Sequence, residues 1–211
     1  MTRPSNKDSF SKLTVIKNLV CTVLSKFLID CLQRVIMSKG NSYIQKWPAS
    51  SRLLHWFSAL LLLITWGLIL LYGNNESSLY INLHKAFGIS VLFWTIARIV
   101  NRFFTDTPPS VPMPKWQSVL ATLTHFLLYA LLIAMPIAGL LMSVYGGRPV
   151  DMFGLFEIPV FVTPDRSAAR FYNDLHTDII WPMLIVFTLS HLGGALYHQF
   201  IKKDNLIKRM S

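Results

Sequence analysis

The segment HTDIIWPMLIVFTLSH, residues 176–191, is an apolar run with a histidine at each end. It belongs to an apolar stretch over residues 175–201, and about 20 mainly apolar residues are enough for a helix to cross a membrane. Three other stretches meet this criterion, at residues 53–72, 83–104 and 118–145. The sequence therefore predicts an all-α integral membrane protein, built as a bundle of four transmembrane helices.

The composition of the whole chain agrees with a membrane protein. Hydrophobic residues make up 53% of the sequence and charged residues only 14%, which is too apolar for an ordinary soluble domain. The net charge of +10 arises mostly from residues at helix ends and in the tails, not from a surface of interleaved basic and aromatic side chains. Binding to nucleic acid is therefore not predicted.

The distribution of basic residues predicts the topology. Cytoplasmic segments of membrane proteins are enriched in Lys and Arg, and the connection 73–82 between the first two predicted helices contains neither. The predicted topology is multi-pass, with both termini cytoplasmic. In the third connection, residues 146–173, three arginines run against this pattern. The residues that carry the prediction are Lys39, Lys46, Arg52, Arg102, Lys115, Lys202, Lys203, Lys208 and Arg209.

Residues 1–47 are predicted to form a cytoplasmic extension in front of a membrane domain over residues 48–211. Residues 14–36 have helical apolar spacing, but four charged residues interrupt it, and each charge at the centre of a span costs roughly 2.5–3.5 kcal/mol. Two interpretations remain open. The segment is an interfacial helix lying on the cytoplasmic leaflet, or the natural start is Met37.

The histidines are the candidate functional residues, because ionisable side chains inside membrane helices are rare and usually functional. With the predicted topology, His55 and His191 lie near the cytoplasmic side, and His84 and His176 lie near the outer side. His176 and His191 are 15 residues apart, or about 22 Å along a helix. The spacing therefore predicts two imidazole pairs at two levels of one bundle.

Two imidazoles facing each other favour haem over other metal centres. Without Cys, Asp or Glu nearby they make a poor zinc or copper site, whereas haem iron needs only two axial ligands from the protein. No Cys-x-x-Cys-His site exists in the predicted helices, so the haems are predicted to be bound without covalent attachment. Bis-histidine haem has no open position for oxygen and suits electron transfer. The alternative is that the four histidines make unrelated polar contacts between helices.

Two basic residues are candidate partners of haem propionates. Arg98 lies 14 residues after His84, which places it within about 40° of the same helix face and near the level of His55 and His191. Lys85, together with Arg170, is the corresponding candidate at the outer level. The alternative for each is an interfacial role, in which the charged group reaches the membrane surface.

Four glycines and two further histidines are the remaining candidate residues. Glycines on the second to fourth predicted helices would allow a flat macrocycle to approach the backbone, or serve ordinary helix packing; they are Gly88, Gly139, Gly193 and Gly194. For His125 three roles remain open: a substitute ligand, a quinone contact or a core histidine. His198 is predicted to be an interfacial residue rather than a ligand.

Five short motifs together resemble the bacterial cytochrome b561 family, over about residues 48–210. The resemblance is greatest to its small four-helix members that act as superoxide:ubiquinone oxidoreductases. It implies that His55, His84, His176 and His191 are the axial ligands of two b haems in the bacterial inner membrane. The motifs are SRLLHW, LHKAFGIS, HFLLYALLIAMPIAGLLM, LHTDI and HLGGALYHQFIKKDNLIKRM.

The resemblance also implies a function. The leading hypothesis is a dihaem electron carrier that oxidises superoxide at the outer face and reduces ubiquinone in the membrane. A second hypothesis is an electron-relay partner of a separate dehydrogenase or hydrogenase, without a substrate of its own. A third, a haem-free scaffold or transporter, is disfavoured, because Asp178 is the only carboxylate placed for an ion path.

One departure from the family predicts a structural irregularity. The interval between His176 and His191 is one residue longer than family members usually have, and one residue turns a helix by about 100°. Pro182 lacks a backbone donor and is therefore a natural place to accommodate the extra residue. We predict a local irregularity, such as a one-residue π-bulge, around residues 177–182.

Overall fold

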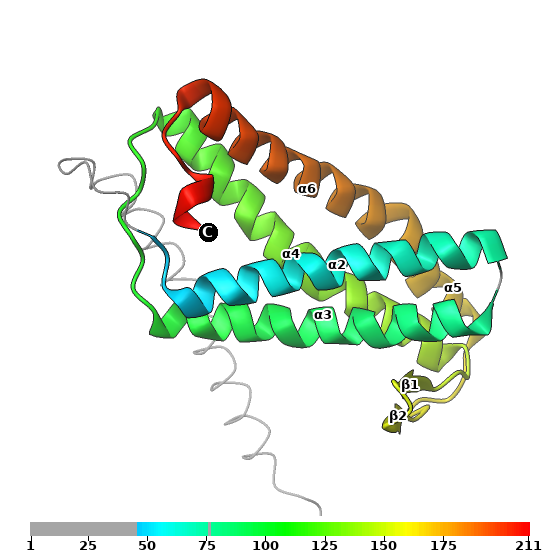
Figure 1. Ribbon diagram of the computed structural model, residues 1–211. Coiled ribbons are helices and arrows are strands. Elements are labelled where there is room, and N and C mark those ends of the chain that lie inside the picture. Colours follow the sequence, from blue (N-terminus) through cyan, green and yellow to red (C-terminus); the bar gives the residue numbers. More distant parts are fainter. Residues whose placement is uncertain (1–45, 76) are drawn as a thin grey trace, which may run out of the picture. The chain divides into compact units, whose positions relative to one another are not determined.

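A computed structural model of the chain describes residues 46–75 and 77–211 (Figure 1). Residues 46–108 and 123–211 form one compact unit, and residues 109–122 belong to a second. The predictions for the N-terminal extension, namely an interfacial helix or a start at Met37, concern a segment outside the described residues.

The described residues contain four helical segments that are long and apolar enough to cross a membrane, which confirms the predicted fold class. The first three are α2 (Ala49–Asn75), α3 (Ser78–Phe104) and α4 (Lys115–Tyr145). The fourth runs without interruption from Arg166 to Lys202. It consists of α5 (Arg166–Asp174), η1 (Leu175–Ile180), α6 (Trp181–Leu196) and η2 (Tyr197–Lys202), and a short 3-10 helix, η3 (Ile207–Arg209), follows.

Apolar side chains hold the larger unit together in two clusters. In the first, Leu131 and Ala138 of α4 pack against Ile180 and Leu184 of the fourth segment, and Trp66 of α2 packs on the same cluster. The second cluster joins α3 to the connection after α4 and contains Ala86, Val150 and Met152. Helices α2 and α3 also lie side by side along their length (Figure 1).

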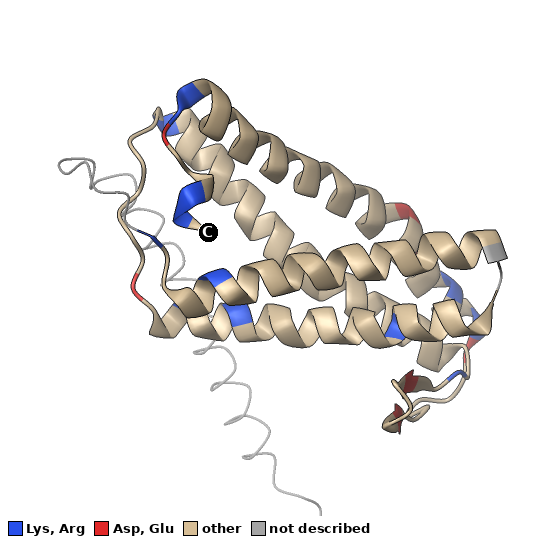
Figure 2. Ribbon diagram, viewed as in Figure 1, with Lys and Arg blue, Asp and Glu red and all other residues tan. Residues whose placement is uncertain are grey.

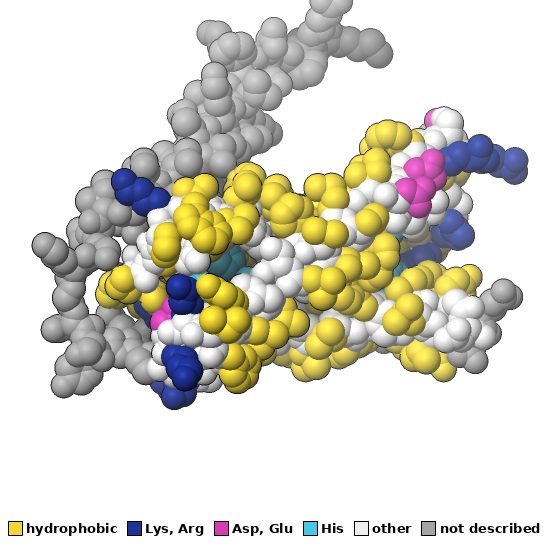
Figure 3. All heavy atoms as spheres, turned by 90° about the horizontal axis from the view of Figure 1, so that it is seen from above, with side chains coloured by type: hydrophobic (Ala, Val, Ile, Leu, Met, Phe, Trp, Pro, Cys, Tyr) yellow, Lys and Arg dark blue, Asp and Glu magenta, His cyan; other side chains and the backbone are white. Residues whose placement is uncertain are grey.

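The outward surfaces of the helices are apolar, as expected for contact with lipid. Large hydrophobic side chains such as Leu63, Phe93 and Val186 are exposed, and hydrophobic atoms cover most of the helices in Figure 3. Charged residues lie mainly toward the two ends of the helices and in the connections (Figure 2). This separation of apolar sides from charged ends matches a membrane-spanning arrangement.

The fourth segment contains the irregularity that the sequence predicts. Residues Leu175–Ile180 form a π-helix, in which the Trp181 N–H donates to the carbonyl of His176, five residues earlier. Pro182 follows directly and has no N–H to offer the Asp178 carbonyl, so an α-helical bond at that position is impossible. The π-turn accommodates one extra residue, which confirms the predicted position and type of irregularity.

The connection after α4 is more structured than the sequence indicated. Strands β1 (Val150–Met152) and β2 (Phe156–Ile158) form an antiparallel hairpin, in which Phe153 and Gly154 have positive φ angles of 59° and 74°. The fourth helical segment begins at Arg166, earlier than the predicted start at residue 175. Asp165 caps it by accepting from the N–H groups of Ser167 and Ala168.

Candidate functional site

The structure brings four of the histidines together as two pairs, each from two different segments. The imidazole of His55 on α2 faces that of His191 on α6, with ring centres 6.2 Å apart and planes at 75°. The imidazole of His84 on α3 faces that of His176 in η1, with ring centres 6.4 Å apart and planes at 86°. Histidine side chains are visible between the apolar side chains toward both ends of the bundle in Figure 3.

The separation within each pair fits a single iron atom between two imidazoles. An iron about 2.0 Å from one nitrogen of each ring would hold the two ring centres about 6.3 Å apart. The observed 6.2 and 6.4 Å agree with this value. The residues present therefore fit a haem held by two axial histidines at each level.

The remaining nitrogens of the His84–His176 pair are fixed by the backbone. The Nδ1 of His84 lies 3.0 Å from the Thr65 carbonyl oxygen, and the Nδ1 of His176 lies 2.9 Å from the Met135 carbonyl oxygen. Because a carbonyl only accepts, each Nδ1 carries the proton, and each Nε2 has its lone pair free for a metal. Metal-binding histidines are commonly oriented in this way.

Gly139 leaves room for His176. A Cβ added at Gly139 would lie 3.0 Å from Cε1 and 3.2 Å from Nδ1 of the imidazole, closer than side chains normally approach. The sequence predicted this glycine to accommodate a macrocycle or helix packing, but its neighbour in the structure is the imidazole itself. The other three candidate glycines, Gly88, Gly193 and Gly194, have nothing within 4 Å of an added Cβ.

The His55–His191 pair is surrounded by side chains rather than by backbone carbonyls. Arg98 NH2 lies 3.1 Å from His55 Nδ1, and its guanidinium lies 5.3 Å from the centre of the Tyr129 ring. A guanidinium only donates, so in this contact His55 Nδ1 accepts and the proton of the neutral ring is on Nε2. Ligation through Nε2 therefore requires Arg98 to turn away from the imidazole, and a propionate carboxylate is a suitable new partner.

A third histidine lies at the same level. The ring of His125 on α4 is 5.1 Å from that of His191, with planes at 70°. The structure thus places His125 beside a candidate ligand, and not in an isolated core position. Among residues 46–75 and 77–211, no group of three or more His, Cys, Asp or Glu side chains is arranged to hold a metal ion.

Lys85 and Arg170, the candidate propionate partners at the His84–His176 level, differ in their exposure. Lys85 is half-buried, and Arg148 is near enough for the two positive charges to repel. Arg170 lies exposed on α5. This end therefore carries basic groups on α3, on α5 and in the loop 146–165, together with the acidic side chains of the hairpin (Figure 2).

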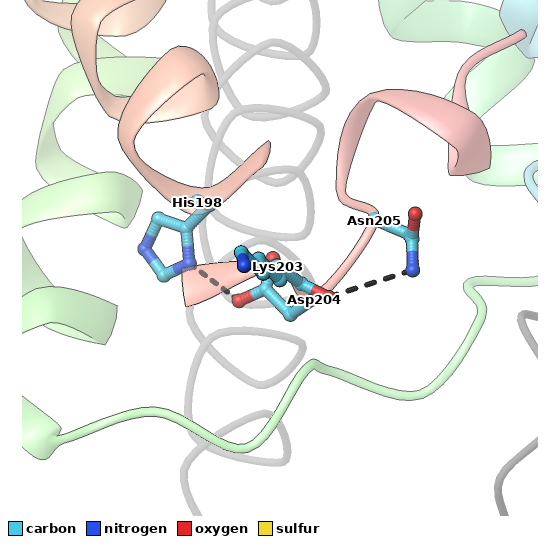
Figure 4. A network of polar contacts seen from close by, with 4 residues as sticks. All are labelled: His198, Lys203, Asp204 and Asn205. Atoms are coloured by element: carbon cyan, nitrogen blue, oxygen red, sulfur yellow. Dashed lines mark hydrogen bonds and ion pairs between the residues drawn. The ribbon is translucent and has the colours of Figure 1, made fainter. Parts of the chain in front are cut away.

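Sequence reasoning missed several neighbours of the histidines. The carbonyl groups of Thr65 and Met135 leave no signal in a sequence, because every residue has one. Tyr129 stands out as a polar side chain in an apolar helix, but its contact with Arg98 depends on how α3 and α4 pack. In η2, which follows α6, His198 Nδ1 lies 2.6 Å from Asp204 Oδ2 (Figure 4), a contact made possible by the turn between the two residues.

Comparison with known proteins gives a consistent result. Residues 46–211 match the family model described as prokaryotic cytochrome b561. The chain is 31% identical over 174 residues to cytochrome b561 homolog 2 of Escherichia coli, covering 79% of this chain and 91% of that protein. It is 32% identical over 167 residues to the probable superoxide oxidase CybB of Yersinia pestis, covering 74% of this chain and 90% of that protein.

Proposed function

This chain belongs to the prokaryotic cytochrome b561 family, and from that premise we propose that it is a dihaem cytochrome that moves electrons from superoxide to ubiquinone. Family membership establishes a multi-pass membrane protein with b-type haem and a role in electron transfer. The number of haems, the ligands, the donor and the acceptor are the parts that we propose.

The observation that carries the proposal is the spacing within the two histidine pairs, since both match the distance that one iron atom would impose. We assign one haem b to His55 and His191 and the other to His84 and His176. Bound haem supplies an iron that changes its charge by one electron without releasing a product. The two histidine pairs would hold these haems at separate levels of one bundle, as an electron carrier across the membrane requires.

The surrounding residues would perform defined tasks. The Thr65 and Met135 carbonyl groups hold His84 and His176 in the orientation that presents Nε2. Arg98 is proposed to neutralise a propionate of the haem at the His55–His191 level, and Lys85 to do so at the other level.

We propose superoxide as the donor and the His84–His176 end as its site of oxidation. The name of one relative, a probable superoxide oxidase, supports this assignment. Lys85, Arg148 and Arg170 would attract a small anion, although Asp151 and Glu157 on the hairpin reduce the field. The electrons balance, because two superoxide ions release two electrons and two molecules of oxygen, and one quinone takes up two electrons and two protons.

The location follows from the same proposal. The His84–His176 end would face the outside of the bacterial inner membrane, and the His55–His191 end, with both termini, would face the cytoplasm. The basic residues at the latter end support this orientation, by the bias of cytoplasmic segments toward Lys and Arg.

The first test is haem quantification in the purified full-length protein and in two variants. We expect two b haems per chain by pyridine haemochrome analysis, with His176→Ala and His191→Ala each losing a different one. A wild-type protein without haem, after expression with adequate haem supply, would contradict the assignment.

The second test concerns the donor. Stopped-flow mixing of the oxidised protein with superoxide should reduce the haems faster than superoxide disappears spontaneously. Reduction only by a protein partner, and not by superoxide, would instead support the electron-relay function.

A further inference from the structure

We propose that the hairpin 150–158 docks its apolar tip into the lipid leaflet at the His84–His176 end of the bundle. The partner of this surface is a layer of zwitterionic phospholipid, in which the hairpin sits as a wedge beside α3. The inference goes beyond the proposed function, because it concerns the connection after α4 and depends on neither the haems nor the electron donor.

The hairpin lies beside the spanning helices and not beyond their ends. Strands β1 and β2 are next to α3 and short of its end (Figure 1). Phe153, at the turn of the hairpin, contacts Phe87 of α3, with ring centres 5.0 Å apart and planes at 80°. Phe87 follows Ser78, the first residue of α3, by nine residues, or about 13 Å along the helix. The turn therefore lies against the membrane-spanning part of α3.

Two basic residues of α3 indicate where this depth falls in a bilayer. Lys85 and Arg102 are 17 residues apart, or about 25 Å along the helix, and the hydrocarbon core of a bilayer is about 30 Å thick. Arg98 lies between them but contacts His55 inside the bundle. Lys85 and Arg102 therefore mark the two edges of the hydrocarbon. Phe87 is only about 3 Å further in than Lys85, so the tip of the hairpin lies at the boundary between headgroups and acyl chains.

The tip exposes large apolar side chains at this boundary. Leu155 is 82% exposed and Phe156 is 60% exposed, and Phe153 adds a third apolar side chain. The tip lies against α3, which exposes Phe93 further along, so it adjoins the surface of the bundle that faces lipid. Exposed apolar patches mark interaction sites, and insertion into the leaflet removes these side chains from water.

The turn adopts an unfavourable conformation that presents an aromatic ring. Phe153 and Gly154 both have positive φ angles, and the Leu155 N–H donates to the Met152 carbonyl at 3.1 Å, as in a type I′ turn. Asn, Asp or Gly is usual at the first central position of such a turn, because bulky side chains rarely adopt positive φ. Residues that break a local rule are expected at functional positions, which favours a role for the Phe153 ring.

The charged side chains of the hairpin fit zwitterionic headgroups. Asp151 and Glu157 face each other across the two strands, and like charges in this arrangement destabilise a hairpin. The Gly154 N–H donates to the Asp151 carboxylate at 2.9 Å, which keeps that charge beside the turn. A lipid ammonium group would neutralise both carboxylates, and Lys85 and Arg148 would attract the lipid phosphate. An anionic lipid without an ammonium group would be repelled by the two carboxylates.

Docking of the hairpin also holds the residues at its base. Val150 and Met152 of β1 pack with Ala86 of α3, and Ala86 directly follows Lys85. Arg148 precedes β1 by two residues. The lipid leaflet therefore helps to keep Arg148 beside Lys85 at the His84–His176 level.

The test uses the full-length, haem-loaded protein in vesicles of phosphatidylethanolamine and phosphatidylcholine, with Cys21 and Cys31 replaced by Ser. An environment-sensitive NBD fluorophore is attached to one introduced cysteine at a time. Leu155→Cys reports on the tip, Glu157→Cys is the matched control on the same hairpin, and exposed Asn74, as Asn74→Cys, is the aqueous reference. Fluorescence is compared with and without each quencher, so that absorption by haem cancels.

Two quenchers measure depth. One is phosphatidylcholine with a doxyl group near the headgroup end of its acyl chain, and the other is iodide on both sides of the membrane. We expect the doxyl lipid to quench Leu155→Cys at least about twofold more strongly than the two other positions, and iodide to show the reverse order. Replacing the lipids by phosphatidylglycerol should reduce doxyl quenching at Leu155→Cys. At this boundary a thiol still reacts slowly with water-soluble maleimides, from the side on which the hairpin lies.

Phe153→Asn separates insertion from folding of the hairpin. Asn tolerates positive φ, so the turn should form, but the ring that reaches Phe87 is lost. We expect doxyl quenching at Leu155→Cys to fall by about half in this background. Haem content and the melting temperature in detergent should not change. Unchanged quenching would overturn the role of the Phe153 ring.

The remaining outcomes are distinct. Equal iodide quenching of Leu155→Cys and Asn74→Cys would place the tip in water, and the inference would be wrong. Protection of Leu155→Cys from both quenchers would mean that a protein covers the tip, either a second copy or another partner, and the inference would again be wrong. Equal doxyl quenching in zwitterionic and anionic vesicles would overturn the choice of headgroup. None of these results alters the haem content, so the proposed function is tested separately.

Discussion

Single residues determine how the imidazoles are positioned, and Gly139 does so for His176. Its hydrogen stands where a Cβ would be 3.0 Å from the His176 ring. The neighbouring turn of α4, with Met135 and Pro136, also supplies the carbonyl that accepts from His176 Nδ1. One turn of α4 therefore positions this imidazole in two ways, by a hydrogen bond and by an absent side chain.

We expect Gly139→Ala to displace His176 and to reduce occupancy of the haem at the His84–His176 level by at least about half, since a side chain that forces such a clash typically costs 1–3 kcal/mol. Haem content and reduced-minus-oxidised spectra measure this. The matched control is Gly73→Ala, where an added Cβ meets nothing within 4 Å. Equal haem content in both variants would show that the imidazole adapts without loss.

Arg98 is the second residue whose replacement has a defined consequence. Removing a positive charge near a haem makes the reduced state less favourable. We expect Arg98→Gln to lower the midpoint potential of the haem at the His55–His191 level by about 40 mV, the one-electron equivalent of about 1 kcal/mol. Redox titration measures both haems, and the potential at the other level should stay constant. A shift confined to the His84–His176 haem would contradict the placement of Arg98.

At the scale of elements, the π-helix η1 has a direct consequence for the register of the fourth segment. It contains one residue more than an α-helix would need between His176 and α6. Deleting exposed Ile179 should convert η1 into regular α-helix and leave both histidines in place, so haem content should remain near two per chain.

Deleting exposed Leu189 provides the control, because it lies in the regular helix α6. There the loss of one residue turns His191 by about 100° relative to the preceding part. We expect this variant to lose the haem at the His55–His191 level. Loss of the same haem in both deletion variants would mean that η1 does not absorb the register change.

The start of α5 depends on the charge of Asp165. The Ser167 hydroxyl and the N–H groups of Ala168 and Ser167 donate to its carboxylate and lower its pKa below the ordinary 3.8. A lowered pKa means that the cap is fully effective above pH 3.8 and is lost as the pH falls through the lowered value. We expect Asp165→Ala to speed amide exchange at Ser167 and Ala168 at neutral pH, as measured by mass spectrometry, while residues in α6 remain unchanged.

Sequence and structure agree on some elements for physical reasons. Long apolar runs predicted the four helices, and the combination of an extra residue with Pro182 predicted η1. The hairpin 150–158 escaped prediction because its strands have only three residues each, too few to show alternation. The start of α5 was also missed. This helix has only nine residues and continues directly into the apolar segment, so the apolar run alone predicted a later start.

The candidate site could be predicted only in part. Equal depth in the membrane predicted which histidines face each other, because depth follows from position in a helix. The contacts of Arg98, Tyr129 and His125 depend on how helices are rotated about their axes, which a single sequence does not determine. The pair His198–Asp204 was missed because a left-handed residue, Lys203, reverses the chain between them.

At the scale of the whole molecule, the two ends of the bundle should be exposed to opposite sides of the membrane. With Cys21 and Cys31 replaced by Ser, a cysteine introduced at Leu155, an 82% exposed residue of the hairpin, should react with an impermeant maleimide in intact spheroplasts. A cysteine introduced at Ser211 should react only after permeabilisation. The reverse pattern would invert the proposed orientation and move superoxide oxidation to the cytoplasmic side.

The two histidine pairs also differ in how mutation can change their surroundings. His84 and His176 are oriented by carbonyl groups, which survive substitution of the side chains at Thr65 and Met135. His55 and His191 are surrounded by the side chains of Arg98 and His125, which a single nucleotide change can replace. Random mutation should therefore change the potential of the haem proposed at the His55–His191 level far more often than that of the haem proposed at the other level, so that the proposed acceptor side can adapt to a new partner while the proposed donor side remains constant.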